Sequence, residues 1–354
     1  MILSKVEYFE LELEMASGYT IAYETISHAK NVVLKLTTNT GLVGWGCAAP
    51  DQEITHETSQ TVINNLEQHI IPMLQGQDPF QLALFNKKLR DTGIKMPSAM
   101  AMTNIALHDL LARKAQLPLY KLMGGFRNKI ATSITIGIMP LNDTLALGKE
   151  YWQQGFKIIK LKGGIEVNED IEKIFKLKEE LGFELILRFD ANQGYTVEDS
   201  IKFIEATKQA EIELFEQPTA FDNLQALKQV TNRVSVPVMA DESIRSLSDV
   251  YHLSKHDASD MINIKIMKVG GLTEAAHINS VAKAAGMEVM VGCLDECALG
   301  ISAGLHFALS RPNVEFADLD GHLDFTNDPF KNLFQLKDGW LYPSEHDGLG
   351  KVDF

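Results

Sequence analysis

From about residue 131 onwards, short apolar runs alternate with segments of helical periodicity, and polar turns separate them. Eight such runs can be drawn, at 133–138, 158–162, 185–190, 212–216, 236–240, 261–265, 287–291 and 314–318. Strands that alternate with helices favour a parallel sheet. Eight β/α units in about 190 residues fit a (β/α)8 barrel better than an open doubly wound sheet. The alternation therefore predicts an α/β barrel.

The residues before the barrel have a different pattern. Extended runs at 5–13 and 31–37 precede helical periodicity at 57–74, and a second helix is expected from about Ser98. We therefore expect an α+β domain over residues 1–125, the barrel over 126–320, and a C-terminal segment over 321–354 that returns to the first domain. Because that last segment is rich in loops, the final helix of the barrel is expected to be missing or displaced.

Composition excludes several classes of partner. Lys plus Arg minus Asp plus Glu is 33 − 47 = −14, and no basic block stands out, so nucleic acid and anionic membrane surfaces are disfavoured. The three cysteines, Cys47, Cys293 and Cys297, are an odd count that fits a reducing compartment. Neither a signal peptide nor a run of eighteen apolar residues is found. We expect a cytoplasmic protein without a nucleic-acid or membrane partner.

Three consecutive apolar runs end in a carboxylate: Asp190, Glu216 and Asp241. In a barrel of this type the functional groups lie at the C-terminal ends of the strands. Three acids on adjacent strands repel one another and are costly to bury without a cation. Mg²⁺ prefers oxygen ligands, and no His or Cys shares these positions, so Mg²⁺ is favoured over zinc. A solvated strand end is the alternative for any one acid, but it explains three in succession poorly.

Lysines end two further runs. Lys162 ends the second run and Lys265 ends the sixth, so in a barrel of eight strands they lie on diametrically opposed strands. Two opposed bases can remove a proton from one face of a carbon and return a proton to the other face. Lys160 points to the same side of its strand as Lys162, because residues i and i+2 share a face. The alternative interpretation is that Lys160 and Lys162 form a solvated strand edge. The presence of Lys265 and the three acids at the same rim of the barrel argues against it.

These motifs, in their order, resemble those of the muconate-lactonising branch of the enolase superfamily. The set comprises Lys160-Leu-Lys162, Arg188-Phe-Asp190-Ala-Asn-Gln193, Glu216-Gln-Pro218, Met239-Ala-Asp241-Glu-Ser243 and Asn263-Ile-Lys265 with Gly270-Gly271. The resemblance implies an α+β capping domain, completed by the C-terminal tail, over a modified (β/α)7β barrel. It also implies one Mg²⁺ per subunit held by Asp190, Glu216 and Asp241, and acid/base catalysis by Lys162 and Lys265. Barrels of this family commonly assemble, so homo-oligomerisation is left open.

The eighth strand discriminates within that branch. Asp318-Leu-Asp320 resembles the Asp-x-Asp of dipeptide epimerases, in which the pair holds the α-ammonium group of the substrate. The resemblance implies that one lysine removes the α-proton, that the cation and Lys160 stabilise the resulting enolate, and that the other lysine protonates the opposite face. Thr135 aligns with a substrate-contacting threonine of that pattern. Cys293 and Asp295, after the seventh strand, complete the expected substrate-binding set.

Substrate specificity is expected in a capping-domain loop near 16–26. Members of the family that prefer a C-terminal glutamate are expected to carry an Arg there, whereas this sequence has Tyr23 and Glu24, and an acid would repel glutamate. We therefore predict a tolerant L-Ala-D/L-Xaa epimerase. Three alternatives stay open: a specific L-Ala-D/L-Glu epimerase in which Lys30 or Lys35 supplies the charge, a lyase of the o-succinylbenzoate synthase or muconate cycloisomerase type, and a non-catalytic small-molecule-binding barrel.

Overall fold

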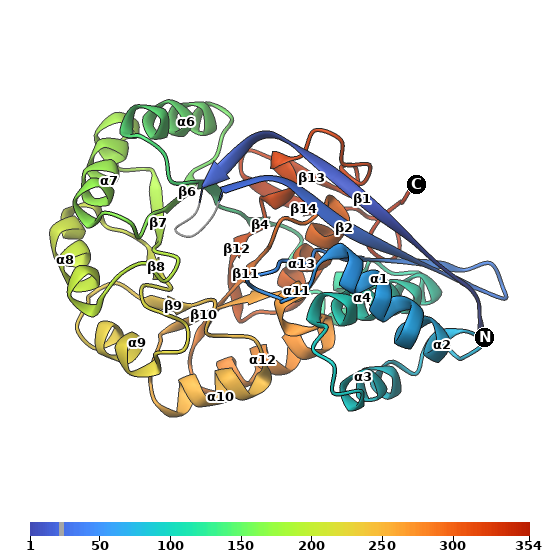
Figure 1. The fold of residues 1–354 in the computed structure, drawn as a ribbon. Helices are drawn as coiled ribbons and strands as arrows, with labels where there is room; N and C mark the ends of the chain where they lie inside the picture. Colours follow the sequence, from blue (N-terminus) through green and yellow to red (C-terminus); the bar gives the residue numbers. More distant parts are fainter. Residues whose placement is uncertain (21–24) are drawn as a thin grey trace.

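A computed structural model of the protein describes residues 1–20 and 25–354. Eight parallel strands form its central sheet, in the order β12-β11-β10-β9-β8-β7-β6-β5 (Figure 1). The strands are β5 (Ile134–Ile136), β6 (Ile158–Lys162), β7 (Ile186–Asp190), β8 (Leu214–Glu216), β9 (Val238–Ala240), β10 (Met261–Lys265), β11 (Glu288–Gly292) and β12 (Val314–Asp318). A parallel bridge between Thr132 and Ala317 connects the first strand region to the last and nearly closes the barrel.

Helices on the outside connect these strands. They are α6 (Leu141–Gln153), α7 (Val167–Leu181), α8 (Val197–Thr207) with the 3₁₀ turn η2 (Lys208–Ala210), α9 (Leu224–Thr231), α10 (Leu247–Lys255), α11 (Ile266–Val269) followed by α12 (Leu272–Ala284), and α13 (Ala298–Ser310). The side chains of Thr196 and Ser246 cap α8 and α10, because each accepts a hydrogen bond from the amide three residues on. After β12 the only helix of the described residues is the 3₁₀ helix η3 (Gly321–Asp324). The predicted (β/α)7β barrel is confirmed.

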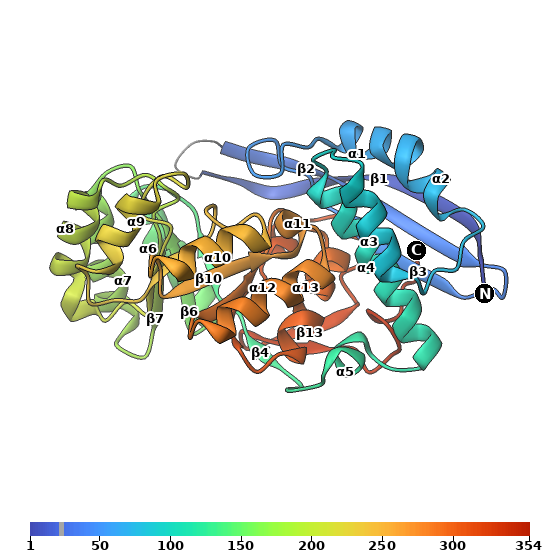
Figure 2. The ribbon, with the colours of Figure 1, turned by 90° about the horizontal axis from the view of Figure 1, so that it is seen from below.

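The N-terminal part forms a second layer beside the barrel. Its antiparallel sheet contains β1 (Leu3–Thr20), β2 (Thr25–Thr38) and β3 (Val43–Ala48). Its helices are α1 (Ser59–Asn65), the π-helix η1 (Leu66–Ile70), α2 (Ile71–Leu74), α3 (Leu82–Asp91), α4 (Pro97–Ala115) and α5 (Leu119–Met123). A Cβ at Gly46 would lie 2.0 Å from the carbonyl oxygen of Met102, so glycine is required where β3 crosses α4. Figure 2 shows the β1–β2 hairpin extending from this layer over one end of the barrel.

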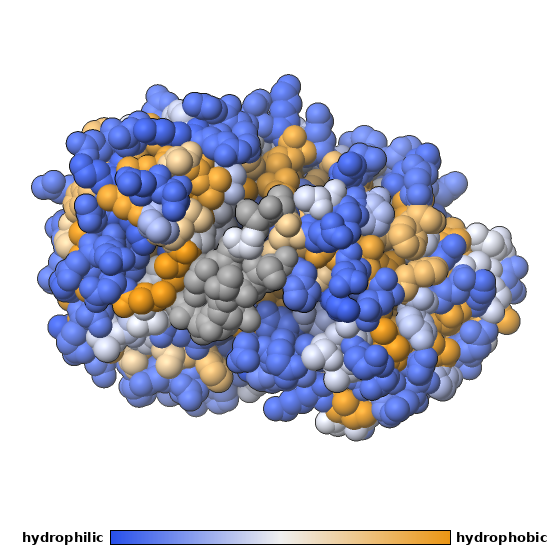
Figure 3. All heavy atoms as spheres, turned by 45° about the horizontal axis from the view of Figure 1, so that its top comes forward, coloured by the Kyte–Doolittle hydropathy of each residue, from blue (hydrophilic) through white to orange (hydrophobic). Residues whose placement is uncertain are grey.

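The C-terminal segment contacts both layers. Strand β13 (Phe334–Lys337) pairs with β14 (Trp340–Pro343), and β14 pairs with β4 (Ile130–Ala131) next to the barrel. Beyond them the amide of Leu349 donates a 2.8 Å hydrogen bond to Asp109 on α4, and the ring of Phe354 lies edge-on to Trp45 at 5.9 Å. The tail therefore fastens the N-terminal layer to the barrel. Hydrophilic residues cover most of the face in Figure 3, as expected for a chain of net charge −14.

Asp109 is the centre of this junction and gives a test of it. Its buried carboxylate accepts hydrogen bonds from the amides of Trp45 at 2.9 Å and Leu349 at 2.8 Å, and from Arg113 Nε at 2.9 Å. We expect Asp109→Ala to lower the free energy of unfolding by about 3 kcal/mol, because it leaves two amides and a guanidinium without their acceptor. Chemical denaturation would measure the loss. Asp91→Ala, which removes an exposed partner of Lys87, serves as the control; an equal loss in both variants would contradict the prediction.

Candidate active site

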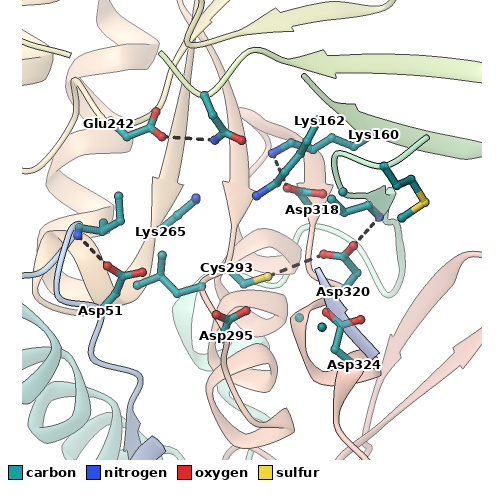
Figure 4. A pocket seen from close by; sticks show the side chains of 18 of the residues that line it. Asp51, Lys160, Lys162, Glu242, Lys265, Cys293, Asp295, Asp318, Asp320 and Asp324 are labelled. Carbon is teal, nitrogen blue, oxygen red and sulfur yellow. Dashed lines mark hydrogen bonds and ion pairs between the residues drawn. The ribbon is translucent and has the colours of Figure 1, made fainter. Parts of the chain in front are cut away.

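A cavity lies at the C-terminal ends of the barrel strands (Figure 4). Most of its lining comes from the strands of the barrel and the segments that follow them, and the N-terminal layer contributes Gly18, Asp51 and Ile54. The hairpin and the loop after β3 therefore reach the mouth of the barrel. The predicted residues Tyr23 and Glu24 lie outside the described residues.

The three predicted ligand acids end adjacent strands and are almost completely buried. Asp190 lies opposite Glu216 in the β7–β8 register, and Asp241 follows β9 directly. Lys160 Nζ lies 3.0 Å from Asp190 Oδ2 and 2.8 Å from Glu216 Oε2. Burial by itself lowers the pKa of Lys160, but Asp190, Asp318 and Glu216 hold it well above its usual value. Lys160 is therefore a buried ammonium group shared among carboxylates.

Two other lysines compensate Asp241. Lys265 Nζ lies 2.8 Å from Asp241 Oδ2, and Lys268 Nζ contacts Oδ1 and the main-chain oxygen of the same residue. Burial acts to raise the pKa of Asp241, but Lys265 and Lys268 hold it far below its usual value. Glu216 behaves in the opposite way, since burial raises its pKa to about 8 against the pull of Lys160.

The donor chemistry of the three acids fits a hard divalent cation. Two buried oxygens, Glu216 Oε2 and Asp241 Oδ2, accept no hydrogen bond from any described residue; Lys160 and Lys265 lie near them at 2.8 Å but outside hydrogen-bond geometry. Among residues 1–20 and 25–354, no group of three His, Cys, Asp or Glu side chains is already clustered as a metal centre. The carboxylates are instead neutralised by ammonium groups, yet they remain an all-oxygen set with acceptor capacity to spare.

The two predicted bases lie across the cavity from each other. Lys162 ends β6 and Lys265 ends β10, and three strands separate β6 from β10 in the sheet. Both side chains line the cavity, and Figure 4 shows them pointing towards one another from opposite sides. Burial lowers the pKa of Lys265, but Asp241 raises it to well above the usual value.

Asp318 ends the strand opposite the ligand acids and Asp320 lies two residues beyond it, yet their surroundings differ. Asp318 accepts hydrogen bonds from Ser133 Oγ at 2.6 Å and Lys160 Nζ at 3.0 Å, which joins it to the buried ion cluster. Asp320 Oδ2 accepts from the amide of Thr135 at 2.7 Å, and its Oδ1 lies 3.9 Å from Cys293 Sγ. Burial and the neighbouring Asp318 raise the pKa of Asp320 to about 6. Thr135, Cys293, Asp295 and Asp320 all line the cavity, as does Asp318.

Several residues that line the cavity were not predicted from the sequence. Asp324 on η3 is only 324 − 318 = 6 residues beyond Asp318, so a longer search past the eighth strand would have found it. Burial, with Asp320 and Asp295 nearby, raises the pKa of Asp324 to about 7. Glu242 directly follows a predicted ligand. Asp51 lies in the N-terminal layer, where no strand-end rule applies, and no sequence signal pointed to it.

Barrel, second layer and site together define a barrel enzyme in which lysines lie beside a cluster of buried carboxylates. Comparison with known proteins agrees. The N-terminal domain of mandelate racemase / muconate lactonizing enzyme matches residues 5–124, and the enolase C-terminal domain-like family matches residues 143–352. The chain belongs to this family, which confirms the expected membership of the enolase superfamily. Among residues 1–20 and 25–354, no helix is both long and apolar enough to span a bilayer.

Three relatives illustrate the likeness. An L-Lys-D/L-Arg epimerase of Desulforapulum autotrophicum is 36% identical, and the match covers 99% of each chain. The substrate-liganded L-Ala-D/L-Glu epimerase of Bacillus subtilis superposes with a TM-score of 0.96 at 31% identity, covering 99% of this chain and 98% of that one. The dipeptide epimerase of Enterococcus faecalis, complexed with Mg and L-Leu-L-Tyr, gives a TM-score of 0.94 at 35% identity and 99% coverage of both chains.

Lys160 offers a test of the ion cluster. We expect Lys160→Met to lower the free energy of unfolding by about 3–5 kcal/mol in buffer free of divalent cations, because three buried carboxylates lose their shared counter-ion. The loss should grow with pH, since the uncompensated acids bind protons more tightly when folded than when unfolded. Chemical denaturation at several pH values measures it. Lys176→Met, on an exposed helix face, is the control; a loss that shrinks with rising pH would argue against the cluster.

Proposed function

We propose that the protein is a Mg²⁺-dependent dipeptide epimerase that inverts an α-carbon by two-lysine 1,1-proton transfer. The observation that carries the proposal is the placement of Lys162 and Lys265, which approach the cavity from opposite sides above the acids of β7, β8 and β9. An α-carbon between two ammonium or amine groups can lose a proton to one and gain a proton from the other. The names of the three relatives, all epimerases, support the same reaction.

Asp190, Glu216 and Asp241 would hold the Mg²⁺. The bound cation supplies positive charge that stabilises the negative charge developing on the substrate carboxylate during proton removal. Lys160, fixed between Asp190, Glu216 and Asp318, adds a permanent positive charge beside the same acids. One lysine removes the α-proton from one face of the carbon and the other lysine delivers a proton to the opposite face; the two lysines exchange these roles for the other epimer, so the reaction runs in both directions.

The opposite wall of the cavity is suited to the ammonium end of a dipeptide. Asp320 and Asp324 line it, while Asp318 is already paired with Lys160, so we assign ammonium binding chiefly to Asp320 and Asp324. A zwitterion then lies with its negative end towards the cation site and its positive end towards these acids. This arrangement argues against a lyase of the o-succinylbenzoate synthase or muconate cycloisomerase type, whose anionic substrate has no evident use for acids there.

The acids of the cavity also bear on the preferred side chain. Asp51 and Asp295 line its mouth in addition to Asp320 and Asp324, and Lys162 and Lys265 are assigned to the chemistry. We therefore propose tolerance for neutral and basic residues and discrimination against glutamate, in place of the L-Ala-D/L-Glu specificity left open by the sequence. The free thiols of all three cysteines support a reducing, cytoplasmic location. Homo-oligomerisation stays a prediction from the family resemblance.

A panel of L-Ala-L-Xaa dipeptides in D₂O tests the reaction. We expect deuterium to enter the α-carbon of the C-terminal residue, to stop on addition of a chelator, and to resume with Mg²⁺. Mass spectrometry measures the uptake. If no dipeptide of the panel, including those with basic residues, takes up deuterium, the proposed function is wrong.

Single lysine variants test the roles of the two bases. We expect Lys162→Ala and Lys265→Ala each to lower the rate of epimerisation by about 10²–10⁴-fold, because one of the two proton-transfer steps loses its general acid/base. Each variant should still exchange the α-proton of one epimer with solvent, and the two variants should exchange opposite epimers. NMR of each pure epimer in D₂O measures this. Exchange of the same epimer by both variants would contradict the two-base arrangement.

Asp324 gives a prediction of pH dependence. Asp320, with a pKa of about 6, and Asp324, with a pKa of about 7, gain charge as the pH rises, so KM for a dipeptide should fall between about pH 5.5 and 7.5. The groups facing Asp324 are Asp320, Asp295, Lys162 and Tyr151. Asp324→Asn should raise KM by about tenfold near pH 7.5 and hardly change it near pH 5.5, where Asp324 is already protonated. Asp353→Asn, at the exposed C-terminus, is the control; a pH-independent effect of Asp324→Asn would refute the assignment.

A further inference from the structure

One asparagine of the N-terminal layer is hydrogen-bonded to the loop that forms one side of the cavity. Asn31 lies on β2 and is 1% exposed. Its Nδ2 donates a 2.9 Å hydrogen bond to the carbonyl oxygen of Asp295, and its Oδ1 accepts a 2.8 Å hydrogen bond from the amide of Cys297. The planar amide therefore contacts two backbone groups of the loop at once, which an aliphatic side chain cannot do.

That loop, residues 293–297, connects β11 to α13 and carries three cavity-lining residues, Cys293, Leu294 and Asp295. Helix α13 begins at Ala298 without a side-chain cap from Cys297. The first backbone amides of the helix instead donate to side chains from other segments: the amide of Cys297 donates to Asn31, and the amide of Ala298 donates to Asp328 at 2.6 Å. The position of the loop thus depends on a residue of the other layer.

The surroundings of Asn31 hold the contact in place. Asn31 pairs with Leu11 across the β1–β2 ladder, so its backbone is fixed within the sheet. Cys47 Sγ on β3 lies 3.5 Å from Asn31 Oδ1 and 3.3 Å from Cys297 Sγ. Cys47 and Cys297 are buried, which excludes water from the contact. Because water cannot replace a lost partner there, breaking either hydrogen bond would leave a buried polar group unsatisfied.

We propose that Asn31 is a positioning residue through which the N-terminal layer sets the place of the loop 293–297, and with it one side of the substrate pocket. The layer then acts on substrate fit through the backbone of a barrel loop, in addition to the side chains that it presents directly at the mouth. The inference rests on the proposed epimerase function, because substrate affinity is its principal readout.

Asn31→Ala is the variant that tests it. We expect KM for an accepted dipeptide to rise by about tenfold, which corresponds to the net contribution of about one hydrogen bond, with kcat changed by less than about twofold. KM is expected to change more than kcat because the two lysines assigned to proton transfer, Lys162 and Lys265, lie on β6 and β10, and the hydrogen bonds of Asn31 are made to neither strand. Hydrogen exchange of the amides of residues 293–297 should also become faster, and this measurement requires no substrate.

Asn104→Ala is a matched control. Asn104 is also a buried asparagine between the two layers: its Nδ2 donates to Thr273 Oγ1 at 2.9 Å, and its Oδ1 accepts from the amide of Thr273 at 3.2 Å. The substitution removes comparable contacts away from the cavity, so we expect KM and the exchange of residues 293–297 to stay close to wild type. If Asn31→Ala does not fold, Asn31→Ser, whose side chain is too short for both partners, takes its place.

Two results would overturn the inference. The first is a KM of the Asn31 variant equal to that of the Asn104 variant. The second, in a preparation whose wild-type protein is active, is amide exchange at residues 293–297 that is the same in the Asn31 variant as in the wild type. Failure of the proposed function is distinguishable from this. In that case the wild-type protein exchanges no dipeptide proton, and the hydrogen-exchange comparison alone decides whether Asn31 positions the loop.

Discussion

Compensation of buried negative charge at the C-terminal end of the barrel is the constraint on which the site depends. Asp190, Glu216, Asp241 and Asp318 are nearly inaccessible to water, and isolated carboxylates in such surroundings are strongly disfavoured. Lys160 is within 3.0 Å of three of them, and the remaining acid, Asp241, is contacted by Lys265 and Lys268. The acids can be buried because the strand ends that carry them lie beside the ends of β6 and β10, which supply the compensating lysines.

The alternation of side chains along a strand then places two lysines of β6 in different surroundings. Lys160 and Lys162 are two residues apart on β6 and therefore share a face, but Lys162 is one strand-repeat nearer the mouth. Lys160 lines the cavity too but is ion-paired with three acids, whereas Lys162 faces Lys265 across the cavity. On the β10 side the same division is made by the short helix α11, which carries Lys268 back towards Asp241 while Lys265 ends the strand. Lys162 and Lys265 face each other across the cavity, and Lys265 also shares Asp241 with Lys268.

Sequence periodicity could predict the strand-end residues of the site but not the contacts that distant loops make with one another. Strand ends are visible as the last residue of each apolar run, so Asp190, Glu216, Asp241, Lys162 and Lys265 were found by one rule. The pairing of Asp318 with Lys160 could not be predicted in this way, because the sequence does not show whether the lysine reaches Asp318 or Asp320 across the barrel. Asp51 and Asn31 were missed for a related reason: they belong to a layer whose contact with the barrel leaves no periodic signal, and only the folded chain brings them to the cavity and its loop.

The separation of the ion cluster from the mouth of the cavity allows specificity to vary while the chemistry does not. Apart from Lys268 on α11, the cluster is built from barrel strands and their ends, and removing a counter-charge leaves a buried charge less well compensated. The residues at the mouth, such as Asp51 and Asp324, are less buried than the cluster, so their replacement changes the charge of the cavity without endangering the barrel. Relatives named for lysine-arginine, alanine-glutamate and dipeptide substrates share this family, and the two compared by structure superpose with TM-scores of 0.96 and 0.94. Substitutions that change substrate preference are therefore expected in the N-terminal layer and in the barrel loops that it contacts. Residues 293–297 form one such loop, which Asn31 contacts through two hydrogen bonds.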